Sequence, residues 1–198
     1  MARRRRALNR FNETHLEMCK HMRVSGAMTR PEIESYIGRN ALRHMQEDGL
    51  LKRKEQVNGK GETLIGFSFT DKGLKSAKRD LELDSFYRGN KLAHDLKMSS
   101  KISELSDSER YTLKTESELR KEFKSHVDEL KEGNLVRALE LSERYSNREI
   151  SIPDFSYTTE LQEVIHYEVV TRNYRDSDIQ AKYEYVEAMG GSLMIEKA

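Results

Sequence analysis

A stretch near residue 40 gathers side chains that can form hydrogen bonds with nucleic-acid bases and phosphates. Ala41, Leu42 and Met45 recur at helical spacing, which predicts a helix over Arg39–Asp48 with these three residues turned inward. The opposite face of that helix is polar, and arginine and asparagine side chains suit the base edges of a major groove. We therefore predict that this face reads duplex DNA through Arg39, Asn40, Arg43 and His44.

Two helices are predicted before this one. The first is expected over Asn12–Val24, with a stripe of apolar residues that makes ordinary core. The second begins after Thr29, which can cap it, and carries Pro31 and Glu32 in its first turn. Proline is tolerated there, and an acidic side chain complements the helix dipole. Gly38 then breaks the chain, so that two short helices meet at a turn.

A basic β-hairpin is predicted directly after the third helix. Gly49 can stop that helix, and strands are expected over Leu50–Val57 and Thr63–Thr70. The sequence Asn58-Gly59-Lys60-Gly61 joins them with residues that accept positive φ. A solvated hairpin on a domain of another purpose is the alternative to a DNA contact. The hairpin carries four cations, and we expect a phosphate backbone to be their counterpart. These cations are Lys52, Arg53, Lys54 and Lys60.

Residues 65–74 resemble the second wing strand and the Thr-x-Lys-Gly start of the closing helix in winged helix–turn–helix DNA-binding domains. Thr70 or Asp71 can cap this closing helix, which is expected to end near Leu83. The resemblance covers roughly residues 8–82 and implies a domain that binds duplex DNA. Alternating apolar residues should bury one face of the strand, namely Ile65, Phe67 and Phe69.

The charge of the chain divides between its two halves. Residues 1–82 hold 18 Lys and Arg against 11 Asp and Glu, whereas residues 83–198 hold 17 against 23. A basic half should meet a polyanion, which favours two domains with different tasks and a boundary near residues 84–90. The basic half comprises a disordered arm at residues 1–10 and the DNA-binding domain at residues 11–83. The arm is expected to contact phosphates or a minor groove through Arg3, Arg4, Arg5 and Arg6.

Composition limits the other possibilities. No apolar run approaches the roughly 20 residues of a membrane span, so we expect a cytoplasmic protein without a membrane partner. Cys19 is the only cysteine, which excludes disulfides within the chain. The six histidines show no zinc-like spacing, and the sequence has no glycine-rich phosphate loop. Neither a structural metal nor an NTPase site is therefore predicted.

The second half, residues 90–198, is predicted to follow the order α-β-β-β-α-β. Its first helix is expected over Asn90–Leu105 and its first strand around Arg110–Thr115. Two further helices interrupt the order, one carrying Leu119 to Leu130 and one over Leu135–Tyr145. The remaining elements are strands at Glu149–Tyr157 and Glu163–Thr171, a helix at Asp176–Met189 and a strand at Ser192–Glu196.

That order, with Ile152-Pro153-Asp154 on one strand and Tyr167-Glu168-Val169-Val170 on the next, resembles the restriction-endonuclease-like PD-(D/E)XK core. The resemblance implies that Asp154 and Glu168 converge on one Mg²⁺, whose bound water attacks phosphorus. A lysine two residues after the second acid normally positions that water, and Val170 stands there instead. The residues that could complete the site are Lys182 on the following helix and, as an additional acid, Glu116 or Glu118.

Together with the winged helix, the sequence Thr115-Glu116-Ser117-Glu118-Leu119-Arg120 and the pair Lys182-Tyr183 resemble the replication-relaxation family of bacterial plasmids and integrative elements. The resemblance implies a two-domain protein of α+β and α/β class that binds double-stranded DNA. Such a protein acts as an accessory in replication, relaxation or conjugative transfer of a mobile genetic element, beside a relaxase. Because Val170 departs from the nuclease pattern, the nuclease-like domain is expected to be inactive and to need no cofactor.

Two alternatives remain open. An active Mg²⁺-dependent endonuclease would use Asp154, Glu168 and Lys182, with Glu118 as a further acid. A winged-helix transcriptional regulator would instead use its second half to sense a ligand or to dimerise. A homodimer is compatible with winged proteins, which often read paired half-sites, although no heptad run of useful length supports it.

Overall fold

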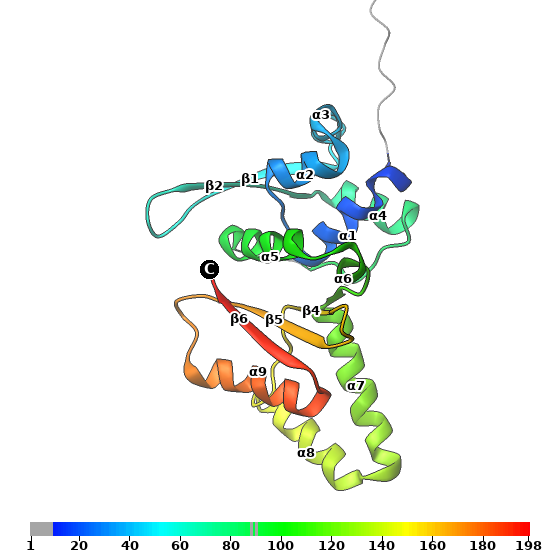
Figure 1. Cartoon of the computed structure of the whole chain (residues 1–198), viewed down its shortest axis with the longest axis vertical. Coiled ribbons are helices and arrows are strands. Elements are labelled where there is room, and N and C mark those ends of the chain that lie inside the picture. The colour runs from blue at the N-terminus through cyan, green and yellow to red at the C-terminus, as the bar shows by residue number, and fades with distance from the viewer. Residues whose placement is uncertain (1–9, 88, 90) are drawn as a thin grey trace, which may run out of the picture. The chain divides into compact units, whose positions relative to one another are not determined.

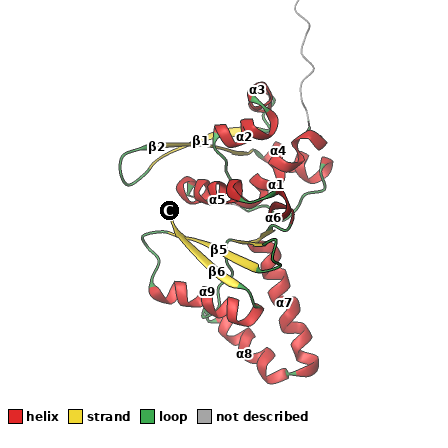
Figure 2. Cartoon of the chain, viewed as in Figure 1, coloured by secondary structure: helices red, strands yellow, loops and turns green. Residues whose placement is uncertain are grey.

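The computed structural model describes residues 10–87, 89 and 91–198 (Figure 1). The chain separates into two compact units, Met1–Glu104 and Leu105–Ala198. Both units combine helices with a sheet (Figure 2), and among the described residues this sheet has two strands in the first unit and four in the second. The predicted mixed α+β class is confirmed. The arm predicted at Arg3 to Arg6 lies outside the described residues, and none of the described helices has the length and apolar character to cross a membrane.

The first unit opens with helices in the predicted order. Their bounds are η1 (Glu13–His15, a 3-10 helix), α1 (Leu16–Ser25), α2 (Arg30–Ile37) and α3 (Arg39–Glu47). Thr29 caps α2, because its side chain accepts a hydrogen bond from the Glu32 backbone N–H at 3.4 Å. The Glu32 carboxylate in turn accepts from the Thr29 N–H at 2.6 Å, which completes a capping box. Gly38, at φ +73°, then turns the chain into α3.

The predicted hairpin and closing helix follow. β1 (Leu51–Val57) pairs antiparallel with β2 (Thr63–Phe69), and α4 (Asp71–Asp80) comes next. Thr70 caps α4 by accepting from the Gly73 N–H at 3.0 Å, and its hydroxyl donates to the Gly49 carbonyl at 2.6 Å. A Cβ at Gly73 would overlap the Leu50 carbonyl oxygen. The Thr-x-Lys-Gly sequence therefore ties the start of α4 to the start of the hairpin.

The core of this unit lies where the three helices meet the base of the hairpin. Phe67 and Phe69 are buried there, as predicted, against residues such as Leu42 and Met45 of α3. The prediction for Ile65 is wrong, because this side chain is 41% exposed. Ile65 pairs with Glu55 and lies two residues nearer the hairpin tip than Phe67, at a point beyond the core. Strand alternation alone does not show how far a hairpin projects beyond its core.

Helix α5 (Leu92–Glu104) belongs to the first unit, whereas the sequence reasoning placed it in the second domain. It packs against α1 and the hairpin. A Cβ at Gly66 of β2 would lie 2.8 Å from Leu92 Cδ1, so the absent side chain at Gly66 admits the helix. His21 Nε2 of α1 lies 3.1 Å from the Ser99 carbonyl oxygen of α5. The boundary between units therefore falls after Glu104 and not near residues 84–90.

The second unit contains four helices and one mixed sheet. Their bounds are α6 (Asp107–Tyr111), β3 (Lys114–Thr115), α7 (Glu116–Gly133), α8 (Leu135–Ser146), β4 (Phe155–Thr158), β5 (Val164–Val170), α9 (Asp176–Met189) and β6 (Ser192–Lys197). The strand order is β3-β4-β5-β6. The β3–β4 and β4–β5 pairs are antiparallel, and β5–β6 is parallel across the connecting helix α9. Buried side chains of α7, α8 and α9 form a separate apolar cluster.

Two strand predictions in this unit were too long. The strand expected at Arg110–Thr115 is reduced to two residues, because Ser106 and Glu109 form a capping box that starts α6 instead. The strand expected at Glu149–Tyr157 begins only at Phe155. The residues before it run alongside α9, where the Ser151 N–H donates to the Ala181 carbonyl at 2.9 Å.

Candidate functional site

Helix α3 presents the polar face that the sequence predicts. Leu42 and Met45 are completely buried and hold the helix on the core. Arg39, Asn40 and Arg43 are exposed on the other side, and His44 is half-buried. Arg43 Nε lies 3.6 Å from Glu47 Oε1, and its side chain remains 67% exposed. Such an exposed pair contributes little to stability, so the guanidinium can exchange this partner for another at small cost.

The hairpin carries exposed cations on β1 and at its turn. Lys52, Arg53 and Lys60 are exposed, and Arg53 also pairs with Glu55 on the same strand. Asn58 Oδ1 accepts from the Lys60 N–H at 2.9 Å and from the Glu62 N–H at 3.0 Å. These two bonds fix the turn, so that the Lys60 backbone has one position at the hairpin tip.

Lys54 does not join these cations as predicted. Its ammonium lies 3.7 Å from Asp95 Oδ2 of α5, and the Asp95 side chain is fully buried. The Gln56 side chain of the same strand accepts from the Leu92 N–H at 2.7 Å. This face of β1 is therefore engaged with α5, and Lys54 helps to hold the hairpin in place.

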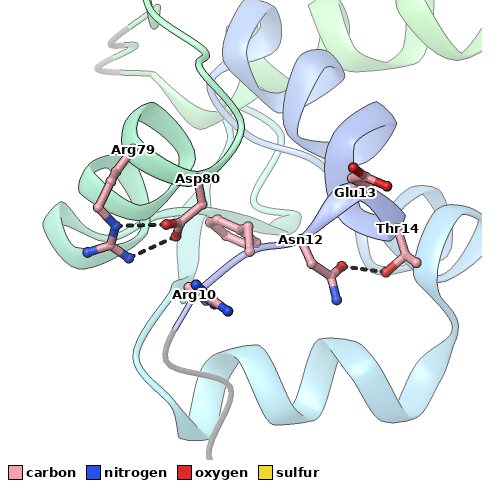
Figure 3. A pocket seen from close by; sticks show the side chains of 7 residues that line it. Arg10, Asn12, Glu13, Thr14, Arg79 and Asp80 are labelled. Atoms are coloured by element: carbon pink, nitrogen blue, oxygen red, sulfur yellow. Dashed lines mark hydrogen bonds and ion pairs between the residues drawn. The ribbon is translucent and has the colours of Figure 1, made fainter.

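A polar pocket of about 560 Å³ lies where the described chain begins (Figure 3). Figure 3 shows Arg79 and Asp80 on one side of it and Asn12, Glu13 and Thr14 on the other, and Arg10 also lines it. Arg79 makes two hydrogen bonds to the Asp80 carboxylate, at 2.7 and 2.9 Å. With two arginines and two acids the lining is formally neutral. It offers no excess positive charge for an anion.

In the second unit, the structure brings together three of the residues predicted for a nuclease-like site. Asp154 precedes β4, Glu168 lies in β5 and Lys182 lies in α9, and all three side chains are buried. Lys182 Nζ is 2.9 Å from Glu168 Oε2 and donates to the Ile152 carbonyl at 2.6 Å. Asp154 Oδ2 accepts from the Val169 N–H at 2.8 Å, and Glu168 Oε2 accepts from the Asp154 N–H at 3.1 Å.

The environment of this cluster changes the acidity of Glu168. Burial, and then the charge of Asp154, raise the pKa of the Glu168 carboxyl from 4.5 to about 7, against the opposing effects of Lys182 and Tyr174. A carboxyl inside a protein favours its neutral form because a charged form loses its hydration. Near neutral pH, Glu168 therefore exchanges between its protonated and ionised forms.

Tyr174 is a member of the cluster that the sequence reasoning missed. Its hydroxyl donates to Glu168 Oε1 at 2.7 Å. Tyr174 lies in the loop between β5 and α9, where its N–H donates to the Thr171 carbonyl in a turn. That turn returns the side chain to the sheet, and no periodic pattern in the sequence signals it.

The proposed additional acids have other partners. The Glu118 carboxylate accepts from the Thr115 N–H at 2.8 Å and completes the capping box in which Thr115 caps α7. The Glu116 carboxylate pairs with Arg120. Val170, which is buried, stands two residues after Glu168, where the resembled nuclease pattern has a lysine. Among the residues that the structure describes, no group of three or more His, Cys, Asp or Glu side chains is arranged to hold a metal ion.

Comparison with known proteins adds no relative. No protein-family model matches the chain, and neither a curated protein nor a solved structure matches it.

Proposed function

We propose that the first unit binds double-stranded DNA as a winged helix–turn–helix domain, with α3 in the major groove and the hairpin against the phosphate backbone. The observation that carries this proposal is the face of α3. Arg39, Asn40 and Arg43 are exposed on a helix whose opposite side is fixed in the core by Leu42 and Met45. A helix held in this way presents its polar groups without having to reorganise when it binds.

The dimensions of the elements suit this role. α3 has nine residues, which corresponds to a length of about 13 Å. An α-helix with its side chains is about 10–12 Å in diameter, and this diameter fits a B-DNA major groove, which is about 12 Å wide. Each hairpin strand has seven residues, or about 23 Å, so the exposed tip with Lys60 can reach a backbone beside the groove.

The distribution of charge supports the same assignment. Residues 1–104 hold 22 Lys and Arg against 14 Asp and Glu, a net charge of +8, and residues 105–198 hold 13 against 20, a net charge of −7. Contacts to phosphates release counterions and make affinity depend strongly on salt. The first unit is therefore the part of the chain suited to a polyanion.

The test is fluorescence anisotropy of the full chain with a labelled random duplex over a range of salt concentrations. Wild-type protein should bind with an affinity that falls steeply with salt, and R39E/R43E should reduce binding at every salt concentration. K121E/K124E, which reverses two exposed cations on α7 of the second unit, is the matched control and should bind as wild type does. Equal binding by the two double variants would refute the proposal.

For the second unit we propose a restriction-endonuclease-like fold in an accessory protein of the replication-relaxation type. The strand order, the parallel β5–β6 pair across α9 and the convergence of Asp154 with Glu168 support this assignment. The role would be DNA processing, relaxation or conjugative transfer of a mobile element, with a relaxase as partner. A pull-down of a plasmid relaxase by the full chain, with and without origin DNA, tests the partner.

A Mg²⁺-dependent endonuclease is the second candidate, because Lys182 does reach Glu168 from the following helix. Incubating supercoiled plasmid with the full chain and Mg²⁺ distinguishes the endonuclease from the accessory DNA-binding protein. Nicking or linearisation that is lost in D154A would establish the enzyme, and unchanged supercoiled DNA would leave binding as the activity.

A further inference from the structure

We infer that the Lys182 ammonium is the resident cation of the Asp154–Glu168 cluster, where it holds β5 and α9 together in place of a divalent metal ion. The inference concerns the second unit and does not depend on DNA binding by the first. The resembled nuclease fold implies a metal between these two carboxylates, and the groups around them do not fit one.

The position of Lys182 is the first reason. Its ammonium lies 2.9 Å from Glu168 Oε2 and 2.6 Å from the Ile152 carbonyl oxygen, and the residue is only 7% exposed. An ammonium donates three hydrogen bonds and accepts none, so it satisfies the two oxygens that face it. The positive charge that balances the ionised Glu168 carboxylate is thus supplied by the chain itself.

The hydrogen bonds to the carboxylates are the second reason. Glu168 Oε1 accepts from the Tyr174 hydroxyl, and Oε2 accepts from both Lys182 and the Asp154 N–H. Asp154 Oδ2 accepts from the Val169 N–H. A carboxylate oxygen has about two lone-pair sites, so Glu168 Oε2 is filled by its two donors. A metal could bind that oxygen only after displacing one of them.

The burial of the two carboxylates is the third reason. Mg²⁺ requires octahedral oxygen coordination at about 2.0–2.1 Å and usually keeps several waters. Glu168 is fully buried and Asp154 is only 8% exposed, and the carboxylates of Glu116 and Glu118 are engaged elsewhere. Two carboxylates in so enclosed a place match one ammonium better than a hydrated dication.

The first experiment measures metal binding by the wild-type chain. We expect electron paramagnetic resonance of Mn²⁺ to show no tightly bound ion, and the melting temperature to respond equally to MgCl₂ and to NaCl of the same ionic strength. Stoichiometric Mn²⁺ binding that D154A removes would overturn the inference.

The second experiment is a double-mutant cycle on thermal stability at pH 8. K182M leaves the Glu168 carboxylate buried without its cation and should lower the melting temperature by roughly 10 °C or more. E168Q/K182M removes both charges and should melt closer to wild type than K182M does. K121M, at an exposed lysine on α7, is the control and should leave the melting temperature unchanged. If K182M and the double variant melt equally below wild type, Lys182 acts by packing alone, and its proposed role as the resident cation is refuted.

Discussion

The raised pKa of Glu168 predicts how the stability of the second unit depends on pH. The carboxyl has a pKa of about 7 in the folded chain, against the ordinary glutamate value of 4.5 that it has when the chain is unfolded. Between these values the folded state holds a proton that the unfolded state has released. The stabilisation is therefore complete below pH 4.5 and is lost as the pH rises through 7. A difference of about 2.5 pKa units corresponds to about 3 kcal/mol in the free energy of unfolding.

The perturbation that isolates this effect is E168Q, which keeps the shape of the side chain and removes its titration. We expect the stability of wild type relative to E168Q to fall by about 3 kcal/mol between pH 4.5 and pH 8. Urea unfolding of the full chain, followed by circular dichroism at several pH values, measures both variants. The control is E187Q, which changes an exposed carboxyl of the same helix as Lys182.

One result would refute this reasoning directly. If the difference in unfolding free energy between wild type and E168Q is the same at pH 5 and pH 8, Glu168 titrates alike in both states. Burial and the charge of Asp154 would then not control its protonation. E187Q keeps Glu168 and should therefore follow wild type at every pH. A difference between wild type and E187Q that changes with pH as much as the difference between wild type and E168Q would show that the effect is not specific to Glu168.

Further predictions concern the first unit. R43A should weaken binding to a selected DNA site by about 1–3 kcal/mol and have little effect on binding to random duplex. K60A should weaken binding to both kinds of DNA alike and reduce the slope of affinity against salt by about 1. Anisotropy titrations distinguish the two variants, and identical behaviour would contradict the assigned roles. G73A should lower the melting temperature, because its Cβ would overlap the Leu50 carbonyl oxygen. The control is G133A, whose Cβ meets no atom within 4 Å and which should leave the melting temperature unchanged. If G73A melts as wild type does, α4 can move away from the hairpin.

Local sequence signals predicted most elements of the fold. The capping box at Thr29 and Glu32 and the turn glycine at Gly38 depend only on neighbouring residues, so the bounds of the helices they flank agree with the structure. The helix over Asp176–Met189 has the predicted bounds, since Gly190 at φ +82° ends it. Such signals act within one or two turns and do not require knowledge of the tertiary structure.

The predictions that were wrong concern features that depend on contacts between distant parts of the chain. Helix α5 joins the first unit because Gly66 leaves room for Leu92, and this fit cannot be seen in either segment alone. The same packing places Lys54 against Asp95, so that Lys54 does not join the cations that we propose to face DNA. In the candidate site, the resemblance to a nuclease pattern suggested Asp154, Glu168 and Lys182. The sequence could not show that the Lys182 ammonium lies against the Glu168 carboxylate, because this contact depends on how α9 packs on the sheet.

The most direct test of the central proposal is hydrogen–deuterium exchange of the full chain with and without a DNA duplex selected from a random pool. DNA should slow amide exchange in α3 and in the hairpin, while the sheet of the second unit and α7 to α9 exchange as before. Protection confined to the second unit, with α3 unchanged, would contradict the assignment of DNA binding to the first unit.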